Sequence, residues 1–204
     1  MKAGARHVVN QAHLGEIKDM MDALTAVQKR EQIADWELLS ITEWFHAHKK
    51  WITYSENLNL EVLYPIYETR FHYPKVLKYG HKEISKFLEQ ISFYLDSWKA
   101  GDEIDILVDM WTRYSTKVNS IVELLNRMHF QLVHAYFTRA EIAEVVGSLV
   151  SDRNCCLGPM VYYQGKDKFR QDVMKKQILD DVHWRKYLCF LVDNTHFYVT
   201  FYRC

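Results

Sequence analysis

Apolar residues recur at three- and four-residue steps along most of the first 150 residues. This spacing puts one apolar side chain on the same face at each turn, and it predicts amphipathic α-helices rather than strands. A first helix is predicted over 7–30. A second is predicted over 33–62, because Pro65 lies just beyond it and the residue before a proline disfavours helical geometry. The apolar face of the first consists of Leu14, Ile17, Met20, Met21, Leu24 and Val27.

The same periodicity predicts a third helix over 75–98 and a fourth over 103–136. Between them, Ala100-Gly101-Asp102 is typical of a helix stop, a turn and an N-cap. Four long helices with short connections predict an all-α fold, an up-down-up-down four-helix bundle.

The chain beyond the fourth helix changes character. Thr138 to Glu141 forms a Thr-x-x-Glu capping box, which predicts a short fifth helix over 139–151. Residues 166–180 have a further helical pattern, and the tail 190–202 is rich in β-branched and aromatic residues. We therefore expect one domain over 1–150, followed by a C-terminal extension over 151–204 that packs on the bundle or on a partner.

Composition narrows the classes of function. The 204 residues carry 26 basic and 26 acidic side chains, which argues against an electrostatic nucleic-acid binder. No apolar run reaches the roughly 18 residues of a membrane span, so no transmembrane segment is expected. The four cysteines include no C-x-x-C, which favours a reducing intracellular compartment, cytoplasmic or within an organelle. The 29 aromatic residues, 13 Tyr, 10 Phe and 6 Trp, fit either a bulky core or an interface with a protein partner.

The segment Glu-Val-Leu-Tyr-Pro-Ile-Tyr-Glu over 61–68, followed by His81-Lys82-Glu83-Ile84, resembles the hemerythrin-like (HHE cation-binding) family. That resemblance implies a four-helix bundle that holds non-haem iron between its helices. In the family, the proline is preceded by H-x-x-x-E-E-x-x-L-F-P. Counting back from Pro65 places Ser55 in the histidine position and Asn59 in the first glutamate position, and neither is a good iron ligand.

At the family's ligand positions on the other helices, some residues in this chain are histidines and others cannot bind a metal. The resemblance implies His13 on the first helix and His81 on the third. On the fourth helix, an ungapped count reaches no ligand pair, whereas a short deletion brings His129 into the histidine position and Val133 into the carboxylate position. The residual metal ligands implied by the family are therefore His13, His81 and His129.

A di-iron centre needs bridging carboxylates, and their loss leaves nothing to join two cations. We therefore expect no cofactor and no catalysis, but a repurposed scaffold that serves as a structural or accessory subunit of a larger protein assembly. The alternative is a single non-haem iron on the residual histidines, with Glu56 or Glu61 recruited, that senses or carries oxygen, nitric oxide or iron. Glu56 is turned about 100° around the helix from Ser55.

The remaining features have plain structural interpretations. His46 and His48 point to different helix faces, and we expect them at the solvent or at an interface. Trp36, Trp44 and Trp51 lie near one helix face, which favours a core stripe over a docking ridge for a partner. The acidic residues at the start of the fourth helix suit its dipole better than a metal patch. No G-x-S-x-G elbow, Walker loop, dinucleotide fingerprint or H-E-x-x-H occurs in the sequence.

Overall fold

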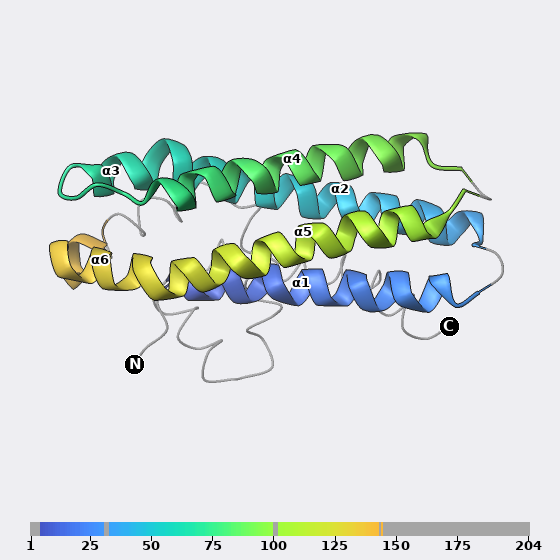
Figure 1. Ribbon diagram of the computed structural model, residues 1–204, viewed down its shortest axis with the longest axis horizontal. Helices are drawn as coiled ribbons and strands as arrows, with labels where there is room; N and C mark the ends of the chain where they lie inside the picture. Colours follow the sequence, from blue (N-terminus) through green and yellow to red (C-terminus); the bar gives the residue numbers. More distant parts are fainter. Residues whose placement is uncertain (1–4, 31–32, 100–101, 143, 145–204) are drawn as a thin grey trace, which may run out of the picture. The chain divides into compact units, whose positions relative to one another are not determined.

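The structure, a computed structural model, describes residues 5–30, 33–99, 102–142 and 144. Within these ranges the regular structure is entirely helical, which confirms the predicted all-α class. The four long helices are α1 (Ala5–Gln28), α2 (Asp35–Leu58), α4 (Lys75–Ser97) and α5 (Ile104–Leu124). Figure 1 labels them along the ribbon. None of the described helices is long and apolar enough to cross a membrane.

The chain divides into two compact units. One is Glu16–Tyr136, and the other comprises Met1–Gly15 together with Phe137–Cys204. In the second unit, Thr138 and Glu141 form the predicted capping box, in which the Glu141 carboxylate accepts from the Thr138 backbone N–H at 2.8 Å. Most of the predicted fifth helix, the helical pattern over 166–180 and the aromatic tail lie outside the described residues.

In the unit Glu16–Tyr136, α4 packs along α5 and α2 packs against α4. The two helices α4 and α5 approach closely at Gly80. A Cβ atom there would lie 1.9 Å from Cδ1 of Ile121, so the site has no room for a side chain unless Ile121 moves. The core of this unit contains these fully buried large side chains: Phe45, Ile52, Tyr64, Leu77, Ile84, Leu88, Trp111 and Tyr114.

The predicted end of the second helix near residue 62 is wrong. The helical backbone continues through a π-helical turn, η1 (Asn59–Leu63), into α3 (Tyr64–Glu68), and the Tyr64 N–H donates to the Asn59 carbonyl five residues earlier. Pro65 then falls in the first turn of α3, where its missing N–H costs no hydrogen bond. The fourth helix has a similar interruption, since α5 passes through η2 (Leu125–His129) into α6 (Phe130–Tyr136).

The connection between α4 and α5 also differs in detail from its prediction. Glu103, rather than Asp102, is the N-cap residue of α5. The Asp102 carboxylate instead accepts a hydrogen bond from the Lys99 backbone N–H at 2.8 Å. An aspartate in a short turn can bond either to the following helix or back across the turn, and the sequence does not distinguish the two.

Candidate functional site

The interior of the unit Glu16–Tyr136 holds a buried carboxylate–imidazole pair. Glu16 on α1 and His48 on α2 are both buried, with Nδ1 of His48 at 2.5 Å from Oε2 of Glu16. The indole N–H of Trp51, one turn after His48, donates to the same carboxylate oxygen. Both polar groups lie on apolar helix faces, so they reach each other only because the two faces pack together.

The other ring nitrogen of His48 is also engaged. Its Nε2 lies 2.8 Å from the hydroxyl of Tyr114 on α5, a side chain that is fully buried. The ring of Trp44 stacks on the imidazole at 5.0 Å between centroids, and Trp111 meets it edge-on at 5.5 Å. We call Glu16, His48 and Tyr114 the Glu16 group; it ties three helices together inside an aromatic shell.

Burial sets the charges of the Glu16 group. Desolvation raises the pKa of Glu16 to about 8, against the opposing effect of the Trp51 hydrogen bond. Desolvation also lowers the pKa of His48 to about 3. The pKa of Tyr114 is raised by burial and then by the negative charges of Glu56 and Glu16. At neutral pH the folded protein therefore keeps Glu16 protonated and His48 neutral, so this part of the core carries no net charge.

A second group repeats the same three residue types. Oε2 of Glu56 on α2 is in contact with Nδ1 of His81 on α4, and the hydroxyl of Tyr64 on α3 meets Nε2 of His81. We call Glu56, His81 and Tyr64 the Glu56 group. Its carboxylate oxygen and the facing Nδ1 are buried and lack an aligned hydrogen-bond partner within the described part of the chain. This contact is less well satisfied than its counterpart in the Glu16 group.

Beyond the Glu56 group, an aromatic cluster includes His129. The ring of Tyr64 stacks on Tyr73 at 4.0 Å between centroids, and the Tyr73 hydroxyl lies 2.9 Å from Nδ1 of His129 in η2. Tyr67 meets the imidazole edge-on at 5.3 Å. Both π-helical segments, η1 and η2, contribute a buried polar residue, Asn59 and His129. Such segments are frequent at functional sites, and here they bring polar groups to the interior.

The structure buries all three histidines that the family resemblance implies, His13, His81 and His129. His81 contacts a glutamate and a tyrosine, and His129 hydrogen-bonds a tyrosine. Within the described ranges, no three or more His, Cys, Asp or Glu side chains are placed to hold one metal ion.

In the family pattern, the histidine position of the second helix holds Ser55, which is half-buried, and the first glutamate position holds Asn59, which is buried. A di-iron centre therefore does not fit this donor set, because no carboxylate occupies a bridging position.

Sequence reasoning missed the Glu16 group. The expectation that His48 faces solvent or an interface is wrong, since the side chain is 1% exposed. One signal was present: His48 lies four residues after Trp44 and four before Ile52, on the apolar face of α2. The predicted tryptophan stripe holds in part, because Trp44 and Trp51 are buried whereas Trp36 is exposed.

Comparisons with family models, with curated proteins and with solved structures found no match for this chain. The resemblance to hemerythrin-like proteins thus depends on the residues quoted above, and it stays a prediction.

Proposed function

We propose that this chain is a non-catalytic scaffold of hemerythrin-like type, an up-down-up-down four-helix bundle that lacks a di-iron site and serves as a subunit of a larger protein assembly. The observation that carries the proposal is the Glu16 group. Both nitrogens of His48 and the carboxylate of Glu16 are hydrogen-bonded to protein partners from three helices. Polar side chains of the kinds that hold iron elsewhere here stabilise helix packing.

The proposal has a physical basis in the cost of burying polar groups. An unpaired buried donor or acceptor costs on the order of 1–3 kcal/mol, so groups inside a core persist when each finds a partner. Glu16 accepts from Trp51, and His48 is bonded at both nitrogens. Such a network fixes the register of α1, α2 and α5 without any bound ion.

The experiment that tests the subunit role measures the mass of the particle that contains this chain. The full-length protein would be tagged and isolated without denaturant from its native source, and its mass determined by light scattering during gel filtration. We expect a particle heavier than the 24.4 kDa of one chain, with a second polypeptide in fixed ratio. A monodisperse single chain would refute the proposal.

A second candidate function is favoured by one observation. In the Glu56 group, the carboxylate and Nδ1 of His81 face each other without an aligned hydrogen bond, while Tyr64 orients the imidazole from its other nitrogen. A ring nitrogen oriented in this way, next to a carboxylate, is the arrangement of a metal ligand with its supporting hydrogen bond. The single-iron alternative would therefore use Glu56, which is buried, rather than Glu61, which is exposed.

This alternative has its own test. Metal content and the near-ultraviolet and visible spectrum would be measured for the wild type, for Glu56→Gln and for the control Glu61→Gln. The single-iron function requires one metal per chain in the wild type and in the control, and a loss in Glu56→Gln. Equal metal content in all three proteins would exclude Glu56 as a ligand.

A further inference from the structure

Tyr114 on α5 is a buried phenol whose hydroxyl faces a base. The side chain is fully buried, and Nε2 of His48 lies 2.8 Å from its hydroxyl oxygen. Oε2 of Glu16 accepts the indole N–H of Trp51, and it lies 2.5 Å from Nδ1 of His48, where it can accept a second N–H. With the hydrogen on Nδ1, Nε2 holds a lone pair toward the Tyr114 hydroxyl, which is the contact of an acid with a base.

This contact favours one reaction of a phenol, the loss of a single electron. A phenol that loses only an electron becomes a radical cation, and an apolar interior makes a new charge on the ring costly. If the hydroxyl proton moves to a base as the electron leaves, the ring becomes a neutral phenoxyl radical. Proton transfer to a positioned base requires hydrogen-bond distance, and Nε2 of His48 is at that distance from Tyr114.

The electrostatics around Tyr114 support the same reaction. Burial, and then the negative charges of Glu56 and Glu16, raise the pKa of Tyr114, so the hydroxyl keeps its proton until oxidation removes it. The same negative charges favour the positive charge that oxidation would leave on His48. On the imidazolium, Nδ1 would donate to Oε2 of Glu16, as the 2.5 Å contact allows.

A run of three aromatic rings leads from Tyr114 toward the edge of the core. The ring of Tyr114 lies 5.0 Å from that of Trp111 between centroids, and the ring of Trp111 lies 5.9 Å from that of Trp44. Trp44 keeps 6% of its surface exposed, whereas Tyr114 has none. Rings in contact divide the path of an electron into short steps, so an oxidant that touches the protein near Trp44 need not enter the core.

We propose that Tyr114 is a redox site, which gives one electron to an outer-sphere one-electron oxidant at the protein surface while its proton passes to His48. The O–H bond of Tyr114 breaks, an N–H bond forms at Nε2 of His48, and the oxidant is reduced by one electron. The products are a neutral tyrosine radical and an imidazolium. This activity goes beyond the proposed subunit function and does not depend on it, because every residue involved belongs to one chain.

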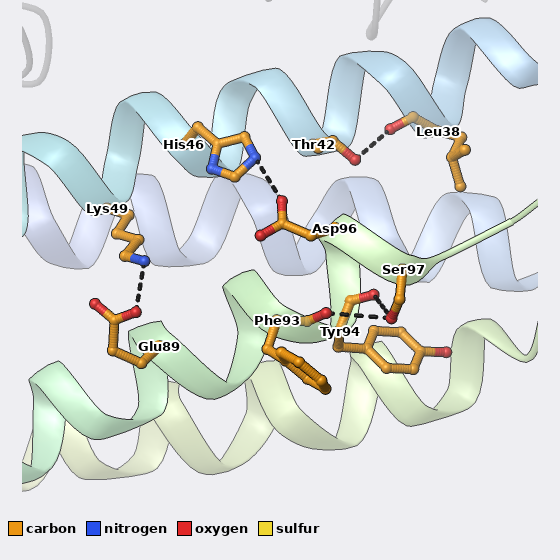
Figure 2. A network of polar contacts seen from close by, with 9 residues as sticks. All are labelled: Leu38, Thr42, His46, Lys49, Glu89, Phe93, Tyr94, Asp96 and Ser97. Atoms are coloured by element: carbon orange, nitrogen blue, oxygen red, sulfur yellow. Dashed lines mark hydrogen bonds and ion pairs between the residues drawn. The ribbon is translucent and has the colours of Figure 1, made fainter.

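The surface of the same helices supplies the controls. His46 on α2 also pairs with a carboxylate, that of Asp96 on α4, at 3.3 Å (Figure 2). These two side chains are 44% and 60% exposed, so water reaches both partners. Tyr79 on α4 is 62% exposed. A radical on an exposed phenol is lost by coupling with other molecules, whereas the buried ring of Tyr114 is protected from them, so persistence of the radical distinguishes the two sites.

The test oxidises the full-length chain with tris(bipyridine)ruthenium(III), which light generates from the ruthenium(II) complex in the presence of a cobalt(III) electron acceptor. Samples frozen after illumination would be examined by electron paramagnetic resonance, and circular dichroism would verify that each variant is folded. The wild type and the control Tyr79→Phe should show a persistent tyrosine radical. Tyr114→Phe should lose this signal.

Two further measurements test the part played by His48. His48→Gln removes the base, and it should slow the formation of the persistent radical after a light flash by at least about a hundredfold, whereas the matched control His46→Gln should leave the rate unchanged. The second measurement needs no variant. Electron–nuclear double resonance of the wild type should detect an exchangeable proton, that on Nε2 of His48, coupled to the radical and absent in deuterated water.

Several results would overturn the redox assignment. They are the absence of a persistent radical in the wild type, equal signals in the wild type and Tyr114→Phe, equal rates in His48→Gln and His46→Gln, or a radical without a coupled exchangeable proton. If His48→Gln does not fold, the double-resonance measurement decides the part played by His48. The mass of the native particle tests the subunit role separately, and neither result bears on the other.

Discussion

The titration of Glu16 gives the most specific prediction, because its folded pKa lies far above its unfolded value. In the unfolded chain the carboxyl has a pKa near 4.5, and in the folded protein burial raises the pKa to about 8. Between these values the folded state holds a proton that the unfolded state has released. Stability is therefore highest below the unfolded pKa and falls as the pH rises toward the folded pKa, by about 1.4 kcal/mol per pH unit.

His48 has the opposite sign. Its folded pKa is about 3, and its unfolded value is 6.5, so the unfolded state binds the extra proton in that range and stability rises with pH. From about pH 4.5 to 6.5 the two effects cancel. Above pH 6.5 only Glu16 changes the stability with pH, and the free energy of unfolding falls by about 2 kcal/mol between pH 6.5 and pH 8. Together, Glu16 and His48 predict a free energy of unfolding that is constant in mildly acidic solution and declines toward alkaline pH.

The variant Glu16→Gln isolates this effect, since glutamine keeps the shape and the hydrogen bonds but does not titrate. Urea unfolding followed by circular dichroism would be measured from about pH 4.5 to about pH 9 for the wild type and the variant. The stability of the wild type minus that of the variant should fall on the order of 5 kcal/mol across the range, because only Glu16 differs. That is a large share of the roughly 5–15 kcal/mol that holds a domain folded.

The exposed Glu61 provides the control. The difference in stability between the wild type and Glu61→Gln should stay near zero over the whole pH range. A difference between the wild type and Glu16→Gln that stays flat from about pH 5 to pH 8 would refute the reasoning. It would mean that Glu16 ionises in the folded protein as it does in water, and is therefore not buried against His48.

Three further predictions concern the same core. Gly80→Ala should lower the free energy of unfolding, measured by urea unfolding, by about 1–3 kcal/mol, because the new methyl group overlaps Ile121. Adding Ile121→Val should restore part of this loss. Full stability of the single variant would contradict the close contact between the two helices. Trp51→Phe removes a hydrogen bond that lowers the pKa of Glu16, so the alkaline decline should extend to higher pH; an unchanged decline would contradict this contact. Tyr114→Phe leaves Nε2 of His48 without this hydroxyl and should cost about 1–3 kcal/mol, measured by thermal unfolding; a cost near zero would show that the hydrogen bond contributes nothing.

Much of the fold could be predicted from periodicity alone, because an apolar stripe at helical spacing reports which face of a helix is buried. The third helix was predicted over 75–98 and is observed over Lys75–Ser97. Pro65 misled the prediction because a proline stops a regular α-helix, whereas here a π-helical turn places it in a first turn that needs no donor.

The polar interior was harder to predict, because its contacts join residues far apart in sequence. Glu16 and His48 are separated by 32 positions, and Tyr114 lies a further 66 from His48. Each was visible as a polar or aromatic residue on an apolar face, but only packing determines which partners such faces bring together. The family pattern implied His81 as a metal ligand, which stays a prediction; in the structure its Nδ1 contacts Glu56, one residue after the expected histidine position at Ser55.

The central claim is that this chain is a scaffold whose polar core, above all the Glu16 group, is held by contacts between its own side chains and not by a di-iron centre. The most direct test is elemental mass spectrometry of the full-length protein purified from its native source without chelators. The account predicts no metal in stoichiometric amount. About two irons per chain would contradict it, since a di-iron centre requires bridging carboxylates, whereas the first glutamate position holds Asn59.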